Sequence, residues 1–253
     1  MLPFCSGMKS NGDLIKSIKS IDFGQEYGNQ GLVREIAYAH NTKELTPLIE
    51  DITMSFDMRD TLSIGDWGGG NGILAKDLYQ RLQNELHITV IDLDDTKFSA
   101  GTRHANVKAD ILAYKPGIRF DYSLSRNVLH YLTPEQQAKF MGNIFDNTRF
   151  GVLLINYTYD EQERKRRREL ERLLKENTGV ERHYMTCEEL VTLVRKNGWE
   201  IKKDATYIIK DFDYESFFRD RFGLEDQILL SLRQTGLLER SDYETTVFYC
   251  KPS

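Results

Sequence analysis

Residues 64–72 of this chain, Ile-Gly-Asp-Trp-Gly-Gly-Gly-Asn-Gly, place an acid and a glycine-rich turn directly after a short apolar run. Three of the glycines stand at alternate positions: Gly68, Gly70 and Gly72. They permit positive φ and remove every Cβ from the turn, so a ligand can lie against bare backbone. A helical pattern from Ile73 to Leu82 follows, and the free N–H groups of its first turn face the same space. The pattern predicts a strand, a tight turn and a nucleotide-sized binding site headed by Asp66.

The glycine spacing separates the candidate ligands. Dinucleotide-binding folds use G-x-G-x-x-G, whereas here the third glycine comes one residue sooner. A glycine-rich helix entry is also compatible with a plain tight turn. The turn taken alone therefore leaves the class of nucleotide open.

Two later apolar runs also end in acid. Residues 90–95, Val-Ile-Asp-Leu-Asp-Asp, do so roughly 20 residues after the turn, where a carboxylate can accept bonds from both ribose hydroxyls of a nucleoside. Asp110 follows a third short strand pattern. Helix capping is the alternative role for Asp94 and Asp95, and an isolated acid such as Asp110 is usually a turn residue. In a parallel sheet all of these groups meet the glycine turn at the carboxyl edge.

The turn and the acids resemble the cofactor site of the class I S-adenosylmethionine-dependent methyltransferases. Asp-x-Gly-x-Gly-x-Gly is similar to motif I of that family, Asp92 matches the acid that binds the ribose, and Asp110 matches the acid that accepts a bond from the adenine amino group. Residues 120–132 look very like the fourth strand and following turn of the small-molecule members. The resemblance covers residues 62 to about 157 and implies S-adenosylmethionine as the cofactor. The residues that it implies for cofactor binding are Asp66, Gly68, Gly70, Gly72, Asp92, Leu93, Asp110, Ile111, Ser125 and Arg126.

Trp67 departs from the family pattern, because that position is commonly small or aliphatic. It is expected to pack on the turn or under the methionine part of the cofactor. Catechol-type members hold magnesium with acids after the fourth and fifth strands, but here those ends read Ser-Arg-Asn (125–127) and Asn-Tyr-Thr (156–158). The motifs of amino-group and pyrimidine-carbon DNA methylases are missing as well. We therefore expect no metal and a small-molecule acceptor.

His130 is the first candidate for a catalytic base. The sulfonium methyl of the cofactor is already activated, so the protein mainly has to align an acceptor lone pair with the C–S bond and exclude water. A base is needed only where the acceptor carries a proton at neutral pH. His130 follows the fourth strand, and an imidazole ionises in the useful range. A histidine that opens a helix is more often a capping or packing residue, and Asn127 and Tyr131 are further candidates for orienting an acceptor.

Alternating strand and helix patterns from residue 61 onward predict the scaffold. We expect an α/β fold with a doubly wound, mainly parallel, seven-stranded Rossmann-like sheet and helices on both faces. One helix should begin at Thr133-Pro134, with Gln136 completing a capping box. The predicted strands are Leu62–Asp66, Ile88–Asp92, Asn106–Ala109, Phe120–Ser125, Gly151–Tyr157, Glu200–Ile208 and Thr245–Cys250.

The flanking segments predict two kinds of addition to this domain of residues 61–253. Residues 1–60 read as an N-terminal helical cap, with Leu14, Ile18 and Ile21 at helical spacing. A second helix should begin at Thr46-Pro47, and the segment either covers the site or packs on the sheet. Its apolar stripe is Leu48, Ile49, Ile52 and Phe56.

Helical insertions are expected at about 159–198 and 209–243. The first contains the basic run Arg164–Arg168, for which a balanced, salt-bridged and solvated helix is favoured over a phosphate-binding surface. The second contains Phe217, Phe218 and Phe222, for which core packing is favoured over a substrate pocket.

Composition narrows the class of protein and the cellular compartment that we expect. The net charge of −5 and pI near 5.6 disfavour a general nucleic-acid binder. No apolar run reaches the roughly 18 residues of a membrane span, and Met1–Lys9 does not read as a secretory signal. Cys5, Cys187 and Cys250 form no CxxC pair, so they are expected to be reduced thiols. We expect a cytoplasmic protein for which an oligomer is compatible with the sequence.

Three alternatives to a small-molecule methyltransferase remain open. The first is methylation of an RNA or a protein side chain, with the arginine run as a docking surface. The second is a non-catalytic S-adenosylmethionine-binding partner subunit. The third is a dinucleotide oxidoreductase, which the glycine spacing disfavours.

Overall fold

The computed structural model describes residues 20–22, 45–55, 61–82, 85–95, 98, 103–178, 182–212, 215, 226–234, 236–237 and 241–253. Its strands join in one eight-stranded sheet. They are β1 (Ser20–Asp22), β2 (Thr61–Trp67), β3 (Glu85–Asp92), β4 (Ala105–Lys108), β5 (Phe120–Arg126), β6 (Thr148–Thr158), β7 (Trp199–Phe212) and β8 (Ser241–Pro252).

The sheet order is β1-β7-β8-β6-β5-β2-β3-β4. All pairs are parallel except those of β8, which runs antiparallel to both β6 and β7, so the sheet is mixed. All seven predicted strands are present. β1 adds an eighth and pairs with β7, so the helical interpretation is wrong for Ile21, while Leu14 and Ile18 lie outside the described residues.

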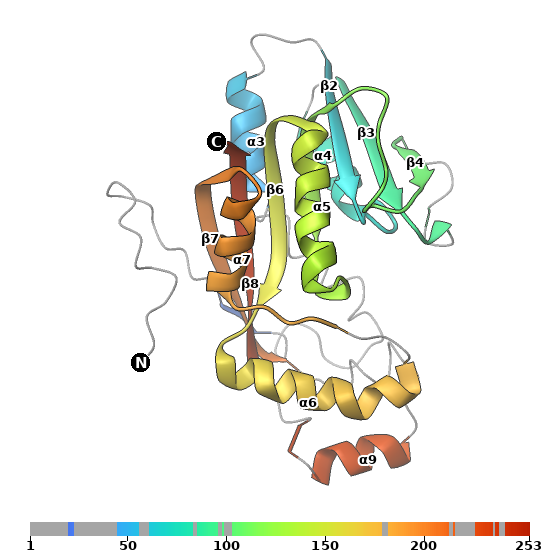
Figure 1. Cartoon of the computed structure of the whole chain (residues 1–253), viewed down its shortest axis with the longest axis vertical. Helices are drawn as coiled ribbons and strands as arrows, with labels where there is room; N and C mark the ends of the chain where they lie inside the picture. Colours follow the sequence, from blue (N-terminus) through green and yellow to red (C-terminus); the bar gives the residue numbers. More distant parts are fainter. Residues whose placement is uncertain are drawn as a thin grey trace.

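Helices cover both faces of this sheet, which confirms the doubly wound arrangement (Figure 1). One face packs against α3 (Thr46–Ser55) and α4 (Ile73–Arg81), and we call it the α4 face. The other packs against α5 (Pro134–Asp146) and α7 (Cys187–Lys196), and we call it the α5 face. The capping box predicted at Thr133 and Gln136 is confirmed at the start of α5.

The leading helix α3 packs on the α4 face. Leu48 and Ile52 are fully buried in the core there. Asp51 anchors the helix, because its carboxylate accepts hydrogen bonds from the hydroxyls of Tyr122 at 3.0 Å and Tyr249 at 2.5 Å. Lys251 completes this cluster at 2.8 Å. The described part of the leading segment therefore packs on the sheet, and Phe56 lies outside the described residues.

Two helices lie beyond the carboxyl end of β6, α6 (Glu161–Thr178) and α9 (Asp226–Gln234) (Figure 1). Arg166 of α6 donates to the carbonyl oxygen of Leu237, just after α9, at 3.0 Å. Phe217, Phe218 and Phe222 lie outside the described residues.

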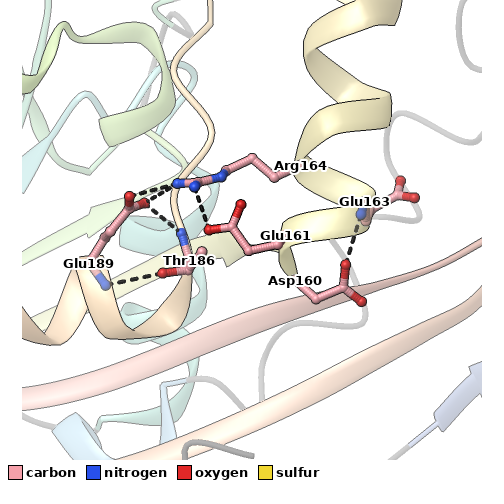
Figure 2. Close-up of polar contacts among 6 residues, drawn as sticks. All are labelled: Asp160, Glu161, Glu163, Arg164, Thr186 and Glu189. Carbon is pink, nitrogen blue, oxygen red and sulfur yellow. Dashed lines mark hydrogen bonds and ion pairs between the residues drawn. The ribbon is translucent and has the colours of Figure 1, made fainter. Parts of the chain in front are cut away.

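The arginine run on α6 is salt-bridged, as expected, but its paired members are not solvated. Arg164 binds Glu189 of α7 and Glu161 of its own helix (Figure 2). Arg167 is buried against Glu163, with its guanidinium over the Tyr159 ring. The expectation of a solvated surface is wrong for these members, because Arg164 pairs with α7, Arg166 binds the Leu237 carbonyl and Arg167 lies over Tyr159. Lys165 and Arg168 of the same run are exposed.

The cysteines differ from one another. Cys250 on β8 is a buried free thiol, as expected. Cys187 is disulfide-bonded, so the expectation of a reduced thiol is wrong at that position, and its partner cysteine lies outside the described residues. Within the part of the chain that is described, no helix is long and apolar enough to span a membrane.

Candidate functional site

The glycine turn joins β2 to α4 and closes against the end of β3. Gly68, Gly70 and Gly72 have φ values of 73°, 56° and 74°, a region that favours glycine. The Gly68 N–H donates to the carbonyl oxygen of Ile91 at 2.7 Å. A β carbon at Gly68 would lie 2.4 Å from the Val128 side chain, so the turn also has to fit under the segment after β5.

Asp92 stands at the end of β3, beside the turn. Its Oδ2 accepts a hydrogen bond from the Gly70 N–H at 3.0 Å, and its Oδ1 accepts one from the Asp94 N–H at 3.0 Å. A carboxylate offers about four lone-pair sites, so two further bonds remain available. Asp92 is half-buried, which leaves that capacity accessible to a ligand.

Asp66 is completely buried one residue before the end of β2. Neither carboxyl oxygen has a hydrogen-bond partner among the described residues. Burial, together with the charge of Asp92, raises the pKa of Asp66 to about 7, although the charge of Arg126 acts in the opposite direction. A buried carboxyl without partners is costly, so this arrangement favours a ligand that brings a cation or a donor.

The remaining cofactor candidates occupy the same edge with different exposure. Leu93 is 67% exposed. The Ala109 N–H, directly after β4, donates to the carbonyl oxygen of Asp92 at 3.0 Å. Asp110 is exposed, and its Oδ1 accepts from the Leu112 N–H at 2.9 Å. Asp110 therefore shapes a turn and keeps its second oxygen for another partner. Ile111 packs at the margin of the core on the α5 face.

Ser125 and Arg126 end β5 and lie on opposite faces of the sheet, because successive strand side chains alternate. Ser125 is fully buried, and its hydroxyl has no hydrogen-bond partner among the described residues. Arg126 lies on the face of Asp66 and acts electrostatically on it. The structure thus brings Arg126, but not Ser125, toward the buried acid.

His130 lies in a short 3-10 helix, η5 (Leu129–Tyr131), after β5. Its ring lies 4.1 Å from that of Tyr131 and stacks on Tyr157 of β6 at 6.0 Å between centroids. Its backbone oxygen accepts from the His183 N–H at 2.8 Å. The imidazole is therefore buried between aromatic rings at the carboxyl edge.

His104 was not expected at the turn, whereas Asn127 was expected as a candidate for orienting an acceptor. His104 lies under Gly72, where a β carbon would come within 2.5 Å of its ring, and burial lowers its pKa. Asn127 has a φ of 54°, and its Oδ1 is buried with no partner in the described residues. Asparagine tolerates this conformation better than most residues. No motif in the sequence pointed to His104.

Trp67 packs away from the buried acid. Its ring lies edge-on to Tyr114 and Phe120, and its Nε1 donates to the Ser123 hydroxyl at 3.0 Å. These contacts place the indole in the core of the α5 face, whereas Asp66 lies on the α4 face. Among the described residues there is no group of three or more His, Cys, Asp or Glu side chains that could hold a metal.

Comparison with known proteins gives the class of this fold. No protein-family model matches the chain, and a search of curated proteins finds no match. A Bacillus halodurans protein assigned to the methyltransferases gives a TM-score of 0.62 at 13% identity over 81% of this chain and 100% of that one. Magnesium protoporphyrin IX methyltransferase from Synechocystis, solved with bound S-adenosylhomocysteine, gives 0.55 at 12% identity over 90% of each chain. YcgJ from Bacillus subtilis gives 0.57 at 14% identity over 77% and 93%.

These likenesses show that the chain has the class I methyltransferase fold. At such low identity they show the fold alone, so the chemistry has to be argued from the residues at the carboxyl edge.

Proposed function

We propose that this protein is an S-adenosylmethionine-dependent methyltransferase that acts on a small-molecule acceptor without a metal. The observation that carries the proposal is Asp66, a fully buried carboxyl group with no partner among the described residues, directly beside the glycine turn. A cationic ligand with a nucleoside part fits this arrangement, because Asp92 retains lone pairs at the same edge.

The hydrogen-bond acceptors at this edge fit the donor groups of the cofactor. Asp92 would accept the ribose hydroxyls, and Asp66 would accept the ammonium group of the methionine part. The exposed Leu93 offers an apolar surface for the adenine, and Asp110 has a free oxygen for the adenine amino group. The bare backbone at Gly68, Gly70 and Gly72 lets the ligand approach closely. Solved neighbours contain this cofactor or its demethylated product.

When bound, the cofactor supplies a methyl group on a positively charged sulfur. Transfer of that group to an acceptor lone pair would be redox-neutral, because the electron pair of the broken C–S bond would stay on sulfur, so no oxidant or reductant would be required. His130 would take the proton of a protic acceptor, since its imidazole lies at the carboxyl edge after β5. Asn127 and Tyr131 would help to orient that acceptor.

A small acceptor is favoured over a nucleic acid or protein surface. The net charge is −5, and three arginines of the run are already paired, Arg164 with Glu189 of α7 and both Arg166 and Arg167 with Glu163 of α6. Two of the neighbours with the shared fold are named for small acceptors, magnesium protoporphyrin IX and 1,6-didemethyltoxoflavin. Methyl transfer to RNA or protein remains the second candidate, and a non-catalytic cofactor-binding subunit the third.

A transfer assay tests the proposal. The full chain is incubated with S-adenosylmethionine and a broad metabolite panel, with and without EDTA, and S-adenosylhomocysteine is measured by mass spectrometry. We expect product with at least one small acceptor and no effect of EDTA. Loss of product in EDTA would contradict the metal-independent reaction. Cofactor binding without product from any acceptor would favour the non-catalytic subunit.

A further inference from the structure

Strand register places a row of functional side chains on the α4 face at the carboxyl edge. Asp66 of β2 is level with Val90 and Leu124, which belong to the core of that face. Asp92 and Arg126 lie two residues beyond those partners, so they share the face. Because β3, β2 and β5 are neighbours in the sheet, Asp92, Asp66 and Arg126 follow one another along its edge.

The same row continues onto β6 and β8. Arg126 is level with Ile155, another core residue of the α4 face, and Tyr157 lies two residues further along β6. Tyr157 stands directly opposite Thr245 of β8. Directly opposite residues of an antiparallel pair have β carbons about 5 Å apart on one face. The row therefore includes Tyr157 and Thr245.

Rings and a cation gather at this end of the row. The His130 ring stacks on Tyr157 with an interplanar angle of 29°, and the centre of the Tyr131 ring lies 4.1 Å from that of His130. The guanidinium carbon of Arg182 lies 5.6 Å from the centre of the Tyr131 ring. Tyr157 and Arg182 are half-buried and Tyr131 is exposed, so these groups are partly accessible.

The segment before α7 is held in place beside these rings. The His183 N–H donates to the carbonyl oxygen of His130 at 2.8 Å, and the Tyr159 N–H donates to that of Met185 at 3.1 Å. These two bonds tie residues 182–185 to η5 and to the end of β6. Arg182 is therefore positioned by backbone contacts at the place where the rings meet.

Thr245 adds an unsatisfied polar atom. The residue is 1% exposed, and its hydroxyl oxygen has no hydrogen-bond partner among the described residues. A buried hydroxyl without a partner destabilises the folded protein. Because Thr245 faces the same side as Tyr157, a polar atom of a ligand stacked there would satisfy it.

We propose that His130, Tyr157, Thr245 and Arg182 form the acceptor subsite, and that it takes a planar aromatic acid. This rests on the proposed function, because the cofactor groups Asp66 and Asp92 occupy the other end of the row. The stacked rings select a flat ring, which packs face to face or edge to face against them. The guanidinium selects a carboxylate, for which its planar fork is matched. The Thr245 hydroxyl selects a ligand that carries a hydroxyl or amino group next to its carboxylate.

The test measures binding of three probes by calorimetry in the presence of S-adenosylhomocysteine. Salicylate has the ring, the hydroxyl and the charge. Trans-2-hydroxycyclohexanecarboxylate keeps the charge and loses the flat ring, and salicylamide keeps the ring and loses the charge. We expect salicylate to bind about tenfold more tightly than either. Equal affinity for the three probes, or no salicylate binding, overturns the proposal.

Substitutions in the proposed acceptor subsite test which residues bind the probe. Tyr157→Leu, Thr245→Val and Arg182→Met should each weaken salicylate binding about fivefold or more, while affinity for S-adenosylmethionine stays unchanged. Arg103→Met is the matched control, because Arg103 makes the same kind of contact with Tyr79, at 4.8 Å, elsewhere on the protein. Thermal unfolding shows that each variant folds, and Arg182→Lys tests the role of the planar guanidinium in a variant that keeps the charge. Unchanged salicylate binding in Tyr157→Leu and Arg182→Met overturns the proposal.

The outcomes separate this inference from the proposed function. A wild-type protein that binds S-adenosylmethionine but does not prefer salicylate contradicts the acceptor class alone. A wild-type protein that binds no S-adenosylmethionine contradicts the proposed function, whatever the probes do.

Discussion

Gly69 lies directly against the carboxyl group of Asp66: a β carbon at residue 69 would come within 2.5 Å of the carboxyl carbon. The turn closes over the acid because residue 69 has no side chain. The result is a carboxyl group removed from water and held beside Asp92 and Arg126. Groups with such a perturbed pKa cluster at functional sites, which favours a ligand at this position.

The first prediction concerns Asp66 and the stability of the ligand-free protein. Its folded pKa of about 7 lies above the ordinary value of 3.8. The contribution of Asp66 to stability is therefore complete below 3.8 and is lost as the pH rises to about 7. Asp66→Asn should abolish this loss and raise the free energy of unfolding at pH 8 by up to about 4 kcal/mol. Denaturant unfolding at pH 5 and pH 8 measures the difference.

The exposed Asp110→Asn is the control, and it should leave the pH dependence of stability unchanged. A variant Asp66→Asn that is less stable than wild type at pH 8 would contradict the picture of an unpaired buried acid. In the same variant the affinity for S-adenosylmethionine should fall about tenfold or more. Wild-type affinity should decrease below pH 7 as Asp66 becomes protonated.

The second prediction concerns the left-handed glycines of the turn. Gly72→Ala introduces a side chain at φ 74° and brings its β carbon within 2.5 Å of His104. We expect a loss of stability of about 1–3 kcal/mol together with weaker cofactor binding. Gly117→Ala is the control, because a β carbon there would meet nothing within 4 Å. Equal melting temperatures for the two variants would contradict this role of the left-handed glycines.

The third prediction concerns the anchor of α3. Burial raises the pKa of Asp51, but the hydrogen bonds from Lys251, Tyr249 and Tyr122 outweigh it and lower the pKa overall. Its stabilising contribution is therefore present above the ordinary value of 3.8 and is lost as the pH falls through the lower folded pKa. Asp51→Ala should cost about 2–4 kcal/mol at pH 7, since it leaves buried donors without an acceptor.

Glu50→Ala is the matched control for this anchor. Glu50 lies on the same helix and pairs with Lys203, but its side chain is 53% exposed. Exposed pairs contribute at most about 1 kcal/mol. Urea unfolding of both variants compares them, and similar midpoints would contradict the anchoring role of Asp51.

The fourth prediction concerns the contact between α6 and α7. The Arg164 side chain is 12% exposed and binds Glu189, whose carboxylate also accepts from the Thr186 N–H in the capping box of α7 (Figure 2). Arg164→Met should destabilise the protein by about 1–3 kcal/mol. The 68% exposed Arg172, which pairs with Glu169 within α6, provides the control Arg172→Met, with an effect below about 1 kcal/mol. Equal effects on thermal unfolding would mean that the two helices do not depend on this pair.

The strands and the cofactor edge could be predicted because their signals are local. The turn is predicted by residue type, from the glycines Gly68, Gly70 and Gly72. The start of α5 is predicted by the spacing of Thr133 and Gln136. The position of Asp92 beside the turn follows from the rule that parallel strands end at one edge.

The features that the sequence did not reveal depend on contacts between distant residues. β1 is too short to show an alternating pattern, and its partner β7 lies far along the chain. The burial of Arg167 depends on Tyr159 and Glu163 meeting it on a packed helix face. Likewise, Tyr157 and Thr245 face each other only through strand register, which no local pattern specifies.

The central claim is cofactor binding at the glycine turn and Asp92, and calorimetric titration tests it most directly. Wild type should bind S-adenosylmethionine and S-adenosylhomocysteine but not NAD. Asp92→Ala should lose affinity for both ligands by about tenfold or more, while Asp95→Ala, which removes an exposed acid paired with Lys108, should not. Tight binding of NAD, or unchanged S-adenosylmethionine affinity in Asp92→Ala, would contradict the account.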